Sequence, residues 1–195
     1  MSRFGFKTCV QDQIGARRTG LETERTCAFG ASWAGVVVAV LMLLATAAPA
    51  DAQEAIYIVR HAERVNDEPQ SLLSAEGHAR AARLADSLRD AGITAVFVTQ
   101  YERTAQTAQP TAARLRLTPV VTRADDTPGL LAKVRALGPA ARVLIAGHSD
   151  TVPEILAALG FPTPVSIAKT EFDNLFVVIP AKAPATLPTV LQLRY

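Results

Sequence analysis

Residues 55–64 read AIYIVRHAER, a stretch that joins an apolar run directly to charged side chains. Ala55 to Val59 have the apolar and β-branched composition of a buried strand. Arg60, His61 and Glu63 follow with only one small residue among them. Because an unpaired guanidinium costs several kcal/mol to bury in an apolar core, this strand is expected to end at a polar site. The stretch therefore predicts a group of functional side chains at the carboxyl end of a buried strand.

Further apolar runs predict more strands, and amphipathic segments predict helices between them. Most of the runs are continuous rather than alternating, which is typical of strands covered on both faces in a parallel sheet. The predicted strands cover residues 56–59, 95–99, 143–146, 175–179 and 189–193, and the predicted helices cover about 74–92, 103–115, 127–137 and 151–159. Strands that alternate with helices indicate an α/β fold. We expect a three-layer α/β/α sandwich with a mostly parallel central sheet.

Arginine and histidine follow three of the predicted strands at the point where each strand ends. Arg60 and His61 follow the first strand, Arg103 follows the second, and His148 follows the run 143–147. Because the carboxyl ends of parallel strands meet at one edge of a sheet, we expect these four side chains to converge. Guanidinium groups match phosphate oxygens, and a helix that begins near Thr151 adds backbone donors. The sequence therefore predicts a phosphate pocket that contains an imidazole.

Few side chains of this chain could act as the nucleophile in such a pocket. Both cysteines, Cys9 and Cys27, fall in the first 52 residues, and the remainder has no glycine-rich phosphate loop and no carboxylate cluster suited to magnesium. Histidine can accept a phosphoryl group on nitrogen, and His61 directly follows an arginine. Two arginines would spread positive charge over the transferring phosphoryl group. We expect neither a metal nor another cofactor.

Four segments resemble the histidine phosphatase superfamily, also called the phosphoglycerate mutase-like family. They are VRHAER, LSAEGHARA, VTQYERTAQTA and AGHSDTVPEIL, in this order, and EFDNLFVVI near the end is similar to a strand of small bacterial members. The resemblance implies that His61 becomes phosphohistidine and that Arg60, Arg103 and His148 bind the phosphate. It implies a metal-independent phosphomonoester hydrolase with the phosphoglycerate mutase-like fold. Family members usually carry glycine where this chain has Ala62.

The acid that protonates the leaving group is the least defined part of the expected site. A leaving alkoxide needs a proton, and no carboxylate stands out in the motifs. Many mutase-like relatives take this acid from the loop after the third strand, which reads RADDTPGL here. The resemblance therefore implies Asp126 as the catalytic acid. Asp125, Glu63 and Asp150 remain alternatives.

Two other functions are compatible with the same motifs. A non-catalytic phosphate-binding module, or pseudophosphatase, would keep the arginines without turnover, but it would not need the nucleophile His61. A phosphoglycerate mutase-type phosphotransferase must retain and reorient its intermediate, and this short chain has little insertion material for a closed lid. Hydrolysis is therefore the preferred function, with a small phosphorylated substrate or phosphosugar as the expected partner.

The segment before the predicted domain resembles an export signal. Residues 33–48 read WAGVVVAVLMLLATAA, which is short for a membrane span, and small residues at positions 50 and 52 fit a cleavage site after Ala52. We expect residues 1–52 to be a signal segment and 53–195 to be the histidine phosphatase domain, with an uncleaved anchor as the alternative. This predicts an exported, periplasmic or secreted protein that contacts membrane only through the export segment.

The charge balance of the chain limits its partners. The 20 Lys and Arg residues nearly equal the 18 Asp and Glu residues, so no strong basic field favours nucleic acid. Residues 53–195 are enough for one domain with a single core. We therefore expect a monomer that binds no nucleic acid.

Overall fold

The computed structural model describes residues 54–181 and 186–195. The predicted export segment and its cleavage site at Ala52 lie outside these residues. None of the helices in the described ranges is long and apolar enough to span a membrane.

The elements follow the predicted alternation of strands and helices. In chain order they are β1 (Ala55–Arg60), α2 (Ala75–Ser87), β2 (Ala95–Thr99), α3 (Glu102–Leu115), β3 (Val120–Thr122), α4 (Thr127–Arg135), β4 (Arg142–Gly147), α5 (Thr151–Ala158), β5 (Asn174–Ile179) and β6 (Thr189–Arg194). Each predicted strand and helix is present. Strand β3 precedes the loop RADDTPGL but is missing from the predicted strand ranges, because it has only three residues and leaves Val120 and Val121 exposed at the edge of the sheet.

The six strands form one sheet in the order β3-β2-β4-β1-β5-β6. β3, β2, β4 and β1 run parallel, whereas β5 is antiparallel to β1 and β6 is antiparallel to β5. In the β1–β4 pair Arg60 lies opposite Gly147, and the backbone N–H of His61 donates to the Gly147 carbonyl at 2.9 Å. This register places His61 beside His148 just beyond the strand ends.

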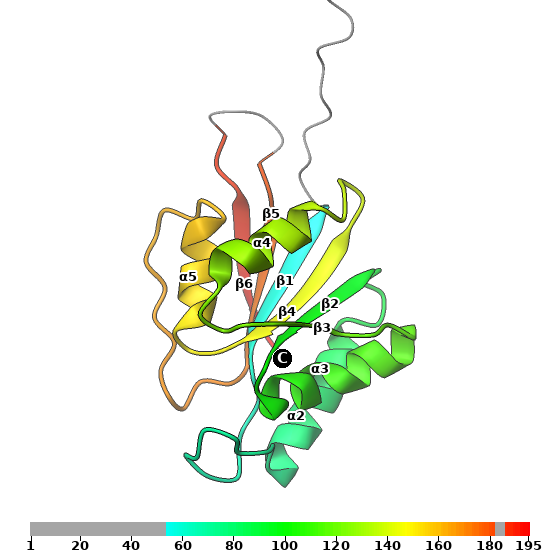
Figure 1. The fold of residues 1–195 in the computed structure, drawn as a ribbon, viewed down its shortest axis with the longest axis vertical. Coiled ribbons are helices and arrows are strands. Elements are labelled where there is room, and N and C mark those ends of the chain that lie inside the picture. Colours follow the sequence, from blue (N-terminus) through cyan, green and yellow to red (C-terminus); the bar gives the residue numbers. More distant parts are fainter. Residues whose placement is uncertain (1–53, 182–185) are drawn as a thin grey trace, which may run out of the picture. The chain divides into compact units, whose positions relative to one another are not determined.

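Helices cover both faces of the sheet, which confirms the predicted three-layer α/β/α sandwich. Ile58 and Val59 are both fully buried but belong to two different core clusters. The cluster with Ile58 contains apolar side chains of α4 and α5, and the cluster with Val59 contains those of α2 and α3. Figure 1 shows the two helix pairs grouped on different sides of the strands. The carboxyl ends of β1, β2 and β4 meet at one edge of the sheet, where residues that follow these strands line a cavity.

The first turn of α2 packs tightly against the segment that follows His61. Ser74 caps the helix by accepting from the Gly77 N–H at 3.1 Å, and the Ser74 N–H donates to the Glu63 carbonyl at 2.9 Å. A Cβ atom on Gly77 would lie 2.1 Å from that same carbonyl oxygen. Gly77 is therefore required for the close approach that fixes the backbone just after the predicted nucleophile.

Substituting Gly77→Ala should lower the free energy of unfolding by about 1–3 kcal/mol, measured by urea denaturation, because the new methyl group meets backbone rather than a movable side chain. Helix propensity alone would give the opposite sign, since alanine is favoured over glycine by about 1 kcal/mol. Ala82→Gly, on the exposed face of the same helix, is the control and should cost only this propensity difference. A Gly77→Ala protein as stable as wild type would contradict the close approach.

Candidate active site

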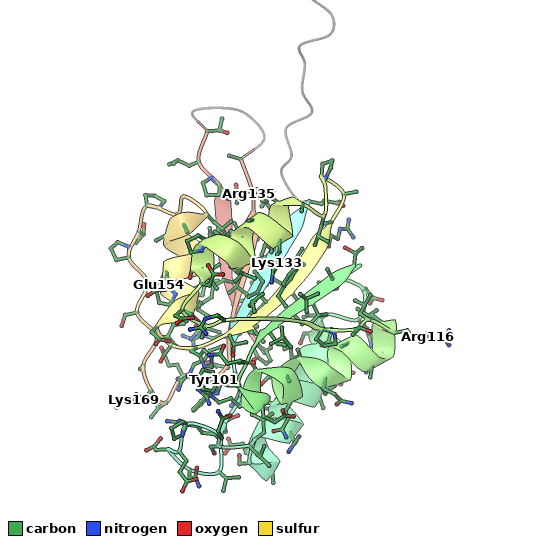
Figure 2. All side chains as sticks on the ribbon, viewed as in Figure 1. Tyr101, Arg116, Lys133, Arg135, Glu154 and Lys169 are labelled. Atoms are coloured by element: carbon green, nitrogen blue, oxygen red, sulfur yellow. The ribbon has the colours of Figure 1, made fainter. Side chains whose placement is uncertain are left out.

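A cavity of about 870 Å³ opens at the carboxyl ends of the parallel strands. The residues that line it include Arg60, His61, Arg64, Tyr101, Arg103, His148, Asp150, Lys169 and Phe172. Figure 2 shows Tyr101 and Lys169 at the same end of the sheet, below α4 and α5. The structure thus brings together the two arginines and two histidines that the sequence predicted to converge.

His61 is held in one tautomer by the backbone. Its Nδ1 lies 2.8 Å from the carbonyl oxygen of Ala62, and a carbonyl can only accept, so Nδ1 carries the proton. The ring is 4 % exposed, and burial is the main cause that lowers the pKa of His61 to about 3, with His148, Arg103 and Arg60 acting in the same direction. At neutral pH the ring is therefore uncharged and Nε2 carries a free lone pair.

Arg60 ties the loop between α5 and β5 to the site. Its Nη1 donates to the carbonyls of Ala168, Lys169 and Glu171 at 2.8, 3.1 and 3.0 Å. The guanidinium also stacks on the ring of Phe172, with 4.1 Å between Cζ and the ring centroid. Its Nε is buried without a hydrogen-bond partner.

Arg103 reaches the site from the first turn of α3. Its Nη1 donates to the Pro69 carbonyl at 2.5 Å, and its Cζ lies 4.4 Å from the centroid of the Tyr101 ring. Its Nε is also buried without a partner. Thr107, one turn further along α3, accepts from the Ala62 N–H at 2.9 Å and donates to the Arg103 carbonyl at 2.7 Å. This hydroxyl couples the position of α3 to the backbone beside His61.

His148 lies edge-on to His61, with ring centroids 5.3 Å apart. Its Nδ1 lies 3.4 Å from Nη2 of Arg103, and its Nε2 lies 2.9 Å from Oγ1 of Thr99. Burial, followed by the charge of Arg103, lowers the pKa of His148 to about 4. The backbone N–H of His148 donates to Oγ1 of Thr151 at 2.8 Å, which fixes the ring at the start of α5.

The structure does not bring Asp126 together with the other four predicted residues. Asp126 is the N-cap of α4, where its carboxylate accepts from the Gly129 N–H at 2.9 Å, and it does not line the cavity. Of the three alternatives, Glu63 and Asp125 line the cavity but pair with Arg80 and Arg123. The third, Asp150, also lines the cavity and accepts from the Thr151 N–H at 2.9 Å. The sequence RADDTPGL is equally compatible with a helix N-cap and with a catalytic acid at Asp126. In the structure Asp126 is the N-cap.

Several side chains at the site were not singled out from the sequence. Arg64 could have been included from the sequence, because it lies in the VRHAER motif itself. In the structure its charge is among the causes that lower the pKa of both Arg60 and Arg103. Tyr101 also lies in a quoted motif. Phe172 and Thr99 gave no signal of their own, since a lone aromatic or a threonine at a strand end most often belongs to the core.

The family comparison covers the part of the chain that carries His61 and Arg103. Residues 56–125 match the Histidine phosphatase superfamily (branch 1). This match agrees, over this segment, with the superfamily that the sequence motifs resemble. His148 lies beyond it. No curated protein matches the chain in sequence.

Solved histidine phosphatase-type structures share the fold at low sequence identity. The protein histidine phosphatase SixA complexed with tungstate is 21 % identical, with a TM-score of 0.59 over 72 % of this chain and 96 % of that chain. A putative phosphohistidine phosphatase SixA from Agrobacterium tumefaciens is 19 % identical, with a TM-score of 0.55 over 73 % and 99 %. A putative α-ribazole-5′-P phosphatase from Escherichia coli K-12 is 14 % identical, with a TM-score of 0.59 over 73 % and 97 %. These likenesses establish the phosphoglycerate mutase-like fold.

No metal site is evident in the part of the chain that the structure describes. Within residues 54–181 and 186–195, no group of three or more His, Cys, Asp or Glu side chains is arranged to hold an ion.

The two buried histidines predict a pH dependence of stability. Their folded-state pKa values lie below the ordinary value of 6.5, so the unfolded chain binds protons first as the pH falls. The stabilisation is therefore complete above pH 6.5 and is lost as the pH falls towards 4. When the pH falls from about 7 to about 5, each histidine should lower the free energy of unfolding by about 2 kcal/mol.

Urea denaturation of wild type, His61→Ala and His148→Ala at both pH values measures this contribution. Each variant should lose its share of the pH dependence, whereas His78→Ala, at an exposed position on α2, should retain all of it. Carboxylates contribute equally to all four proteins, so an unchanged pH dependence in His61→Ala would contradict a buried neutral ring.

Proposed function

We propose that the domain hydrolyses phosphomonoesters through a phosphohistidine intermediate on His61. The observation that carries this proposal is the 2.8 Å hydrogen bond from Nδ1 of His61 to the Ala62 carbonyl. It leaves Nε2 as an unprotonated nucleophile in a cavity that two arginines also line. A site built only to bind phosphate would gain nothing from a neutral imidazole with a free lone pair.

In the first step the phosphate group of the substrate binds to Arg60, Arg103 and His148. The unpartnered Nε atoms of both arginines offer donors to its oxygens, because a buried donor without a partner is costly unless a ligand satisfies it. Nε2 of His61 then attacks phosphorus, a P–N bond forms, and the P–O bond to the leaving group breaks. The departing oxygen takes a proton from an acid, and water later attacks the phosphohistidine to release inorganic phosphate.

We assign the proton donor to Asp150 in place of Asp126. Asp150 lines the cavity, and its charge acts on Arg60, Arg103 and His148 alike. Glu63 and Asp125 are each held by an arginine, through hydrogen bonds to Arg80 and Arg123, and the bond to Arg123 lowers the pKa of Asp125. Of the carboxylates of Glu63, Asp125, Asp126 and Asp150, only that of Asp150 both lines the cavity and has no ion pair with a described arginine.

The proposed substrate is a small phosphorylated molecule such as a phosphosugar. A cavity of about 870 Å³ is within the range of sites that accept drug-sized ligands, so it can hold more than phosphate alone. With the export segment inferred from the sequence, we propose that the enzyme acts in the periplasm or outside the cell as a monomer. Neither a metal nor another cofactor enters the proposed reaction.

Brief exposure to a phosphorus-labelled substrate should trap a phosphoenzyme whose P–N bond acid destroys and alkali spares. His61→Ala should lose both the label and the turnover, because no other nucleophile replaces Nε2, while the folded protein still binds phosphate. His78→Ala is the matched control and should retain both. Turnover should survive EDTA, since no metal activates water. Full turnover in His61→Ala would refute the mechanism, and absence of label in an inactive wild type would favour a phosphate-binding module.

The acid assignment can be tested with two matched substitutions, Asp150→Asn and Asp126→Asn, because asparagine preserves a helix N-cap while removing the proton donor. With an alkyl phosphate, which has a poor leaving group, Asp150→Asn should lower kcat by about 10²- to 10⁴-fold. With p-nitrophenyl phosphate, whose leaving group needs no proton, the loss should be small. Asp126→Asn should behave as wild type with both substrates. The reverse pattern would restore Asp126 as the acid.

A further inference from the structure

Thr99, the last residue of β2, lies against the ring of His148 on the side away from the cavity. Its Oγ1 lies 2.9 Å from Nε2 of His148, and both residues are buried, at 8 % and 7 % exposed. His148 lines the cavity that holds His61, whereas Thr99 does not. The ring therefore presents Nδ1 to Arg103 and the cavity, and Nε2 to Thr99.

We propose that Thr99 is a positioning residue that keeps a proton on Nε2 of His148, so that Nδ1 is the atom at which this ring gains and loses a proton. The proposal rests on the proposed function, since it concerns a residue that binds the transferring phosphoryl group. It adds to the site a further functional side chain, one that touches neither substrate nor nucleophile.

The tautomer of His148 follows from what each neighbour can do. A guanidinium only donates, so Arg103 must donate to Nδ1, across 3.4 Å. In a neutral imidazole the other nitrogen then carries the proton, and Nε2–H donates to Thr99. Burial and the charge of Arg103 keep the pKa of His148 at about 4, so this neutral form is the one present at neutral pH.

A second threonine fixes the direction of the Thr99 hydroxyl. Oγ1 of Thr104 lies 3.0 Å from Oγ1 of Thr99 and accepts from the Thr99 N–H at 3.0 Å. The Thr104 hydroxyl can donate to the carbonyl of Tyr101, at 2.8 Å, which can only accept. Thr99 then donates to Thr104 and keeps a lone pair directed at His148. The chain of donors runs from His148 through both hydroxyls to a backbone carbonyl.

This arrangement has a consequence for phosphate binding. When a phosphate dianion enters, its charge opposes the effect of the two arginines on His148. Nδ1 can then take a proton from solvent and donate it to a phosphate oxygen, while Nε2 keeps its own proton and its bond to Thr99. His148 changes from acceptor to donor at one atom only, without turning its ring.

The test combines Thr99→Val, Thr99→Ser and Thr111→Val. Valine has nearly the shape of threonine but cannot accept the Nε2–H, so Thr99→Val should lower kcat/KM by about 10- to 100-fold. Serine restores the hydroxyl, and Thr99→Ser should stay within about threefold of wild type. Thr111→Val is the control, because the Thr111 hydroxyl is also buried but has no hydrogen-bond partner, and it should leave kcat/KM unchanged.

Nitrogen NMR of His148 gives a readout that a merely structural role would not affect. At about pH 8, where phosphate is almost wholly dianionic, titration of the wild type with inorganic phosphate should leave Nε2 protonated and change Nδ1 from unprotonated to protonated. Thr99→Ser should give the same spectra. In Thr99→Val the preference for Nε2–H should be lost.

Loss of the Nε2 proton when phosphate binds, or wild-type kcat/KM in Thr99→Val, would overturn the proposal. If Thr99→Val does not fold, the wild-type and Thr99→Ser spectra decide in its place. If the wild type turns over no phosphomonoester, the proposed function fails, yet the phosphate titration still confirms or refutes the role of Thr99.

Discussion

The hydrogen bond from Nδ1 of His61 to the Ala62 carbonyl is the interaction on which the chemistry of this domain depends. It assigns the single proton of a neutral imidazole to one nitrogen and leaves the other free to attack. The carbonyl can do this because the backbone on both sides of it is held in place. The Ala62 N–H is bound by Thr107 of α3, and the backbone of Glu63 packs on the first turn of α2. Both helices on that face of the sheet thus help to orient one proton.

The second constraint is positive charge on Arg60 and Arg103, neither of which forms an ion pair with a described carboxylate. Arg60 and Arg103 are both more than nine-tenths buried, and their hydrogen bonds go to backbone carbonyls and to one imidazole. Phe172 and Tyr101 place aromatic faces against the two guanidinium groups. These contacts position the charges without cancelling them, so the cavity favours an anion and keeps both histidines neutral. Burial of these charges is costly without a ligand, but it also strengthens their electrostatic attraction to a bound phosphate.

Much of this arrangement could be predicted from the sequence, because it follows from strand ends. Apolar runs that end at or shortly before Arg60, Arg103 and His148 locate the site before any coordinates are known, since parallel strands share one carboxyl edge. Three features required the structure. Asp126 occupies a helix cap, and no sequence pattern separates a capping aspartate from a catalytic one. Phe172 meets Arg60 only through a long loop, and Thr99 has a role only because β2 ends beside β4.

The most direct test of the account locates the phosphoryl group on the trapped phosphoenzyme. Nitrogen–phosphorus coupling in the NMR spectrum of the histidine-labelled protein shows which ring nitrogen bears phosphorus. The geometry predicts coupling to Nε2 of His61, with Nδ1 still protonated and bonded to Ala62. Coupling to Nδ1, or to a ring nitrogen of His148, would contradict it.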